Sequence, residues 1–262
     1  KNANLINKLS KSIDPYLLKE NKGLKLYYGQ DTKFQRPKAS YIYKIFLPKK
    51  YQNLDNQILL QLYIASVNES MNETSYPARL AGMNYNVYSD IEGINIAING
   101  YSDSIDDLLI EVIKHLKHIN ITNEQFNNLK EQMIRNWKNV SLGDAWRIAR
   151  ENMRKIVRKH YFTSSEIASA AQNFELSDVK KNGKIFLKKG YIEGLVYGNV
   201  TEDEALNNTE LLMNKLKIKP EKQSNVIRQK RLNVNPGEKI LNVVQSEVNN
   251  SCLNRLQYFG EN

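Results

Sequence analysis

The sequence contains little cysteine, little histidine and no long apolar run. Its single cysteine, Cys252, excludes an internal disulfide and predicts a reducing, cytoplasmic location. No stretch of the 262 residues is apolar over the length that crosses a bilayer, so we expect no membrane partner. The chain contains only three histidines, so few side chains are available as ligands of a metal centre. They are His115, His118 and His160.

The composition is that of a folded, basic protein. Hydrophobic residues make up 41% of the chain and charged residues 25%, which is too apolar for a disordered segment. A net charge of +10 admits nucleic acid, an anionic membrane or an acidic polypeptide as partner. Asparagine and lysine are abundant throughout, and codon bias of an AT-rich genome would explain part of that charge.

Alternating apolar and polar residues predict strands, and apolar residues spaced by three and four predict helices. Strand patterns stand near both ends of the chain, with helical patterns between them. This order predicts an α+β fold, with an antiparallel or mixed sheet and a helical cluster packed on one face. We expect strands at 24–28, 39–47, 83–89, 94–101 and 191–196, and helices at 53–72, 76–80, 105–119, 122–137, 144–158, 177–190 and 201–217. A further short helix is expected to begin at residue 163.

Capping residues fix where several of these helices begin. A threonine followed three residues later by Gln or Glu forms a capping box, in which each side chain accepts a hydrogen bond from the other residue's backbone. Asn53 and Ser104 are single capping residues of two further helices. The capping boxes are Thr122 with Gln125, Thr163 with Glu166, and Thr201 with Glu204.

The end of the chain repeats the pattern of its beginning. After a polar stretch and the turn at Asn235-Pro236-Gly237, two strand-like runs resemble the opening pair of strands. We therefore expect both ends to be cut from a longer protein, with a tail that packs on the main domain or self-associates. The predicted organisation is an approach segment at 1–22, a domain at 23–220, a linker at 221–236 and the truncated start of a second copy at 237–262.

A series of short motifs occurs in order over nearly the whole chain: KLYYGQD (25–31), PKA (37–39), AG (81–82), NGYSD (99–103), YGNVT (197–201) and EVNNSC (247–252). Together they resemble the pitrilysin/insulysin family of zinc metallopeptidases, and most of all the insulysin branch in its middle region. The resemblance implies a parent protein of four similar α+β domains, which close in two halves around a peptide substrate. This chain would be the third domain and the first strands of the fourth.

The resemblance also implies where the chemistry is. The family carries H-x-x-E-H on the first helix after the opening strands, because two histidines one turn apart bind zinc and the glutamate polarises water. The corresponding stretch here, 53–66, contains neither His nor Glu. We therefore expect no catalytic residue, no metal ligand and no cofactor in this chain, and zinc in the parent's first domain. The predicted function is a non-catalytic part of the chamber of a peptide-degrading metalloendopeptidase, with the parent's other domains and peptides as partners.

An arginine stripe is the strongest charge feature. It lies on the predicted helix at 144–158, at spacings of three and four, so its members share one face. A solvated helix face explains it most simply; an anion- or substrate-facing surface is the functional interpretation. The stripe consists of Arg147, Arg150, Arg154 and Arg158.

A second candidate site is the set Glu111, His115 and His118. Spacings of four and three on one helix could present three ligands to a metal. These residues lie beside the apolar stripe, near Lys114 and Lys117, so we interpret them as a solvated face. The chain contains two tryptophans, Trp137 and Trp146. Tryptophans of this kind are typically anchors in a core or an interface.

Two other functions fit the same sequence. Proteins of this fold also act as inactive structural subunits, and H-x-x-E-H upstream in the full-length protein would argue against that role. A basic nucleic-acid-binding module is a less favoured interpretation, because the tyrosines are scattered along strands and form no stacking platform.

Overall fold

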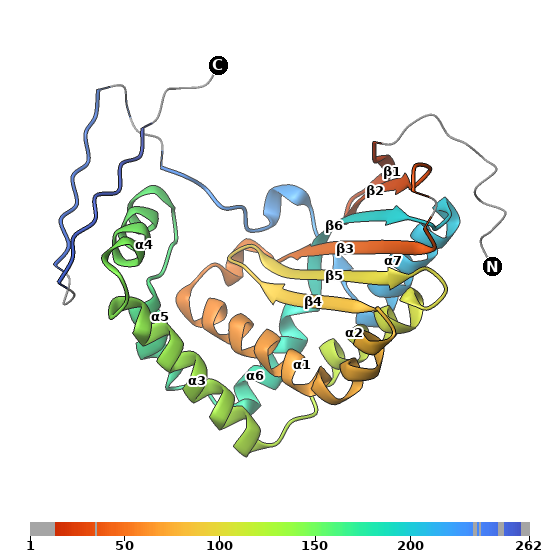
Figure 1. Ribbon diagram of the computed structural model, residues 1–262, viewed down its shortest axis with the longest axis horizontal. Coiled ribbons are helices and arrows are strands. Elements are labelled where there is room, and N and C mark those ends of the chain that lie inside the picture. Colours follow the sequence, from red (N-terminus) through yellow and green to blue (C-terminus); the bar gives the residue numbers. More distant parts are fainter. Residues whose placement is uncertain (1–13, 35, 233–234, 236, 246–248, 258–262) are drawn as a thin grey trace.

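The computed structural model describes residues 14–34, 36–232, 235, 237–245 and 249–257 (Figure 1). The elements are β1 (Tyr16–Asn21), β2 (Leu24–Gln30), β3 (Lys38–Phe46), η2 (Lys49–Tyr51), α1 (Leu54–Leu80), β4 (Asn84–Ser89), β5 (Gly93–Tyr101), α2 (Ile105–Lys117), α3 (Asn123–Ser141), α4 (Ala145–Val157), α5 (Ser164–Ala171), α6 (Leu176–Phe186), β6 (Lys189–Gly198), α7 (Glu202–Leu216), β7 (Lys219–Pro220) and η3 (Gln223–Asn225).

The strands form one mixed sheet, as the sequence predicts. Its order is β1-β2-β6-β3-β5-β4, and the short β7 pairs with β6. Strand β6 comes late in the chain and inserts between β2 and β3, parallel to β2 and antiparallel to β3. The two ends of the domain therefore share one sheet, which confirms the α+β fold.

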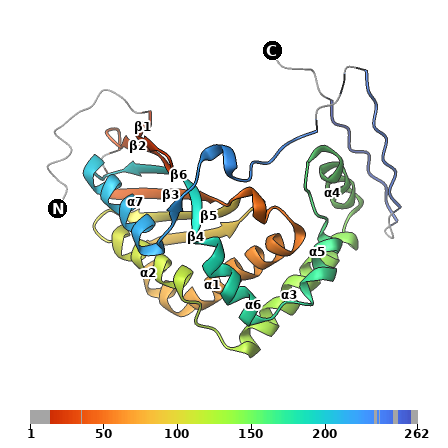
Figure 2. The ribbon, with the colours of Figure 1, turned by 180° about the vertical axis from the view of Figure 1, so that it is seen from behind.

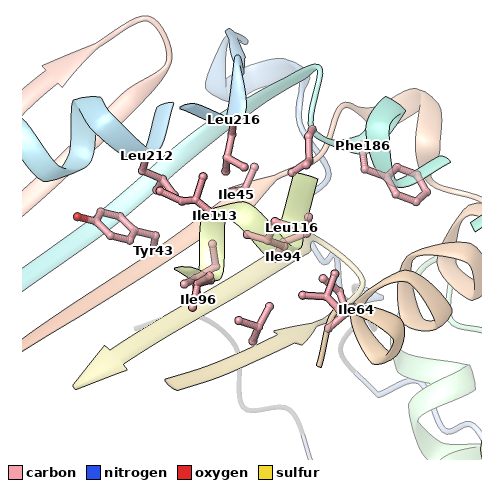
Figure 3. Packing of buried hydrophobic residues seen from close by; sticks show 14 of the residues in the cluster. Tyr43, Ile45, Ile64, Ile94, Ile96, Ile113, Leu116, Phe186, Leu212 and Leu216 are labelled. Atoms are coloured by element: carbon pink, nitrogen blue, oxygen red, sulfur yellow. The ribbon is translucent and has the colours of Figure 1, made fainter. Parts of the chain in front are cut away.

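Helices α1, α2, α6 and α7 lie on one side of this sheet, and the views from front and back agree (Figures 1 and 2). The prediction of a helical cluster on one face is confirmed. Alternate residues of β2, β3, β5 and β6 point into this layer and are almost fully buried. Figure 3 shows the middle of the core, where Tyr43, Ile45, Ile94 and Ile96 from the sheet meet Ile64, Ile113, Leu116, Phe186, Leu212 and Leu216 from the helices.

The predicted caps are largely present. All three capping boxes form, and the Asn53 side chain accepts a hydrogen bond from the Asn56 backbone N–H at 2.9 Å. Ser104 precedes α2 as expected, but its side chain makes no capping hydrogen bond. Helix α6 begins after Glu175 and ends at Phe186, which is earlier than the sequence predicts.

Helix α1 differs most from its prediction. The sequence predicts a helix to about residue 72 and a separate piece at 76–80, whereas α1 is continuous and includes Pro77. A proline removes one amide donor, and near a helix end few later turns depend on it. The helix ends before Gly82, whose φ of +76° matches the left-handed conformation expected of a glycine after a helix.

The segment before residue 23 contains a strand that the sequence did not indicate. Strand β1 pairs antiparallel with β2 and forms an edge of the sheet. Its pairing shifts register between Leu17 and Lys19. Such polar, irregular edge strands resist pairing with other chains, and for the same reason they lack a clear period-two pattern.

Residues 221–232, which we call the strap, fold back across the domain. Val226 and Ile227 are 0% and 2% exposed, and the Ile227 N–H donates to the Leu47 carbonyl at 2.8 Å. The strap begins at the buried Glu221, where a hydrogen bond from Lys189 lowers the pKa of the carboxyl to about 2. The polar composition of 221–236 predicts a linker, but its first part, the strap, contributes the buried residues Val226 and Ile227.

The described part of the tail, 237–245 and 249–257, lies apart from the sheet in both views (Figures 1 and 2). These residues form no strand, and their apolar side chains face solvent. Leu241, Val243 and Leu253 are 84%, 83% and 88% exposed. The second copy of the domain stays a prediction, and 246–248 and 258–262 fall outside the described residues.

Candidate functional site

The face of the sheet opposite the helices is largely uncovered. Its centre is a line of apolar side chains that runs across the strands, and the cross-strand partners place them in register. Leu17 and Ile42 are 44% and 45% exposed, and the others are partly buried. We call this line the apolar row; it consists of Leu17, Tyr27, Leu195, Ile42 and Ala97.

Charged side chains border the apolar row on one side. Lys44 Nζ lies 2.7 Å from Asp90 Oδ2 and 2.5 Å from Glu92 Oε2. Partial burial lowers the pKa of Lys44, but the hydrogen bonds with these two carboxylates outweigh it and raise the pKa. Burial alone would raise the pKa of the Asp90 carboxyl. Its hydrogen bonds, with Lys44 first among them, and the charge of Lys44 act in the other direction, and the pKa is lowered overall. The pKa shifts of Lys44 and Asp90 therefore both favour the ionised forms, and the ion pairs hold the lysine in position.

The strap covers one end of this face. Val226 packs with Phe46 and Tyr191 in a small buried cluster. The Arg228 guanidinium lies 3.7 Å from the centre of the Phe46 ring and 2.6 Å from Glu193 Oε1. The remaining face presents side chains, because the backbone groups of the central strands are paired within the sheet. A ligand here would contact side chains rather than add a strand.

Helix α1 does not offer a zinc site. Its first turns contain no His and no Glu, and the Gln57 Oε1 atom is buried without a hydrogen-bond partner. Across the described residues, no group of three or more His, Cys, Asp or Glu side chains is close enough to hold a metal ion. The residues that the structure describes therefore offer no set of side chains that fits zinc.

The structure brings Glu111 and His115 together but leaves His118 apart from them. His115 is buried and its ring nitrogens lie 2.9 Å from Ser70 Oγ and 3.0 Å from Glu111 Oε1. His118 follows the end of α2 and is exposed. The interpretation as a solvated face is therefore wrong for His115, which joins α2 to α1. The apolar residues of α2, spaced by three and four, predict only its apolar buried face. They give no sign that the polar side chain of His115 is also buried, in contact with Ser70 of α1.

The arginine stripe lies on α4 and just beyond it. Arg147 and Arg150 are exposed, and Arg154 and Arg158 are partly buried. None of the four has a carboxylate within 4.0 Å in the part of the chain that the structure describes. Figure 1 shows α4 at the end of the molecule away from the centre of the sheet, so the stripe and the apolar row are separate surfaces.

Trp137 and Trp146 differ in burial. Trp137 packs against the main core, as expected of an anchor. Trp146 is 48% exposed, and the Arg147 guanidinium lies 5.3 Å from its ring centre. A partner surface for Trp146 is not shown.

Sequence reasoning missed the apolar row. The alternation over 41–46 signals that Ile42 and Lys44 share the face opposite Tyr41 and Tyr43. Alternation cannot reveal which face of the sheet the helices cover, nor that Leu195 lies beside Ile42.

No helix among the described residues is long and apolar enough to cross a membrane.

Comparison with known proteins agrees with this architecture. The chain is 27% identical to human insulin-degrading enzyme over 250 residues, which are 93% of this chain and 24% of that enzyme. It is 25% identical to "Putative zinc protease mug138" of Schizosaccharomyces pombe over 223 residues, covering 85% of this chain and 23% of that protein. The crystal structure of pitrilysin superposes with a TM-score of 0.76 at 20% identity, over 84% of this chain and 23% of pitrilysin.

The chain thus spans about a quarter of the length of the curated relatives that it matches, 24% for the human enzyme. Residues 1–170 match the protein family described as the middle or third domain of peptidase M16. The resemblance to the pitrilysin/insulysin family is confirmed: this chain belongs to the peptidase M16 family, as its middle, non-catalytic domain region.

Proposed function

We propose that this domain forms part of the wall of a chamber that encloses peptides in an insulysin-like zinc metalloendopeptidase. The uncovered sheet face carries the proposal. Zinc and the catalytic residues would belong to another domain of the parent protein, since 53–66 contains no metal ligand of the expected motif. The other domains of that protein and its peptide substrates are the proposed partners, in the cytoplasm.

The geometry of the face supports contact with varied peptides. Neighbouring strands are about 4.8 Å apart, so the apolar row extends for about 19 Å across five strands. An extended peptide rises about 3.3 Å per residue and would span the row with about six residues. Contact through apolar side chains alone discriminates weakly between sequences, which suits a wall that confines many substrates.

The arginine stripe would be a second surface facing acidic parts of a substrate. Four guanidinium groups on or just beyond one helix raise the local potential within a Debye length of about 8 to 10 Å. This role is a proposal for Arg147, Arg150, Arg154 and Arg158 together. Because the stripe is separate from the apolar row, the two surfaces can be tested independently.

Substitutions in the full-length parent protein test the wall. Ile42→Lys places a charge in the apolar row, whereas Ile110→Lys places the same charge on α2, at a residue that is 42% exposed against 45% for Ile42. We expect Ile42→Lys to raise KM for an apolar peptide several-fold with little change in kcat, because the wall binds substrate and transition state alike. Equal effects of the two substitutions would contradict the proposal.

A further inference from the structure

The strap and the end of α4 form a short antiparallel bridge in which Arg158 lies opposite Arg231. The Lys159 N–H donates to the Lys230 carbonyl at 3.0 Å, and the Leu232 N–H donates to the Val157 carbonyl at 2.7 Å. These bonds flank the arginines, which are therefore the non-hydrogen-bonded pair of the bridge. In such a pair the side chains share one face and stand closest together.

Two arginines in this position repel each other. Both guanidinium groups are charged at any physiological pH, and like charges directly opposite across strands are destabilising. No carboxylate lies within 4.0 Å of either among the residues that the structure describes. Nearby acids have other partners: Glu166 pairs with Lys155 at 3.2 Å, and Glu151 accepts from Ser164 Oγ at 2.6 Å. The bridge thus holds two cations together without a described counter-ion.

We propose that Arg158 and Arg231 bind carboxylates of an acidic polypeptide segment. A guanidinium presents paired N–H donors that match a carboxylate, so two of them on one face can hold one or two carboxylates. Arg231 is exposed and Arg158 partly exposed, so a single small anion would stay hydrated and weakly bound. A segment with several linked carboxylates gains from each further contact.

The surroundings favour an extended acidic segment. Arg154 lies in the last turn of α4, and Arg158 is the first residue after the helix, where the backbone becomes extended. Four residues separate them, which corresponds to a rise of about 6 Å along the helix axis. Alternate residues of an extended chain, which share one side, are about 6.8 Å apart. Successive carboxylates on such a chain can therefore meet Arg154 and then the pair. This inference rests on the proposed role of the arginine stripe and deepens it, because it adds Arg231 and names linked carboxylates as the ligand. Its test uses neither cleavage nor the apolar row, so it can fail while the chamber wall stands.

Binding of a fluorescein-labelled hexaglutamate peptide to the 262-residue chain, followed by anisotropy at about 0.05 M salt, tests the site. We expect the double substitution Arg158→Gln/Arg231→Gln to weaken binding about tenfold, through loss of charge-assisted hydrogen bonds. The matched control is Arg79→Gln/Arg135→Gln, which removes the same charge from exposed positions on α1 and α3. The control should weaken binding less than about twofold, the effect of net charge alone.

Two results would overturn the proposal. One is equal weakening by the two double variants, which would assign binding to net charge. The other is displacement of the labelled peptide by inorganic phosphate as readily as by unlabelled hexaglutamate, which would indicate a site for small oxyanions. If the glutamine variant fails to fold, Arg158→Lys/Arg231→Lys replaces it, because lysine keeps the charge and loses the paired donors.

Discussion

The side-chain amide of Asn208 on α7 donates a hydrogen bond of 2.7 Å to Asp106 Oδ1 in the first turn of α2. The same nitrogen lies 2.9 Å from the Tyr41 hydroxyl, which joins both helices to β3. Burial raises the pKa of Asp106, although its hydrogen bonds with Tyr41 and Asn208 act against this. Asp106 as a whole is exposed, so the network compensates, in part, the cost of shielding one side of its carboxylate from water.

Asn208→Ala should lower the free energy of unfolding by about 1–3 kcal/mol at neutral pH, because Asp106 loses one of its two side-chain donors and the Tyr41 hydroxyl loses the donor that it accepts from. A carboxyl whose folded-state pKa is raised favours folding below its ordinary value of 3.8, and that contribution is lost as pH rises through the folded-state pKa. Loss of Asn208 raises this pKa further, so the destabilisation should be larger at about pH 7 than at about pH 4.

Urea unfolding at both pH values measures this effect. Asn214→Ala is the control, since Asn214 is an exposed asparagine on the same helix. A loss in Asn208→Ala that is the same at both pH values would show that Asn208 does not stabilise the ionised carboxylate.

Gly183 on α6 should not tolerate alanine. A Cβ atom at this position would lie 2.4 Å from the Tyr63 ring of α1, which is itself 1% exposed. Alanine favours a helix by about 1 kcal/mol relative to glycine. Overpacking of the α1–α6 contact should outweigh this, and we expect a net loss of about 1–3 kcal/mol in urea unfolding. Lys184→Ala, at the exposed neighbouring position, should change stability little; a gain in Gly183→Ala would disprove the close contact.

Two truncations should separate the strap from the tail. Deletion of 237–262 removes exposed apolar residues, so we expect nearly the same melting temperature and less self-association. Deletion of 221–262 also removes the buried Val226 and Ile227, each of which contributes about 1.5–3 kcal/mol, and should lower the melting temperature clearly. Thermal unfolding and light scattering measure both. A large loss of stability on the first deletion, without a change in association, would place the tail within this domain.

The sequence predicts those features that depend on neighbouring residues. Thr122 with Gln125 forms a capping box because both partners lie within one helical turn. The strands from β2 to β6 follow from alternation in the same way, and so does the placement of Ile42 and Tyr43 on opposite faces of the sheet.

The features that the sequence does not reveal depend on distant partners. Arg231 lies beside Arg158 only because the strap returns across the domain, and no local pattern encodes that return. His115 is buried because α2 packs on α1 at Ser70, although Lys114 and Lys117 lie close to it in sequence. Strand β1 is a polar edge strand, whose pairing depends on β2 rather than on its own alternation.

Photo-cross-linking from the open sheet face tests the central claim most directly. A benzophenone side chain at position 42 of the full-length parent protein reports contact with the apolar row, and one at position 110 reports the helical side. With an uncleaved peptide bound, the account predicts a peptide adduct at 42 and none at 110. Absence of an adduct at 42, or equal adducts at both positions, would contradict the assignment of this face to the wall that encloses the substrate.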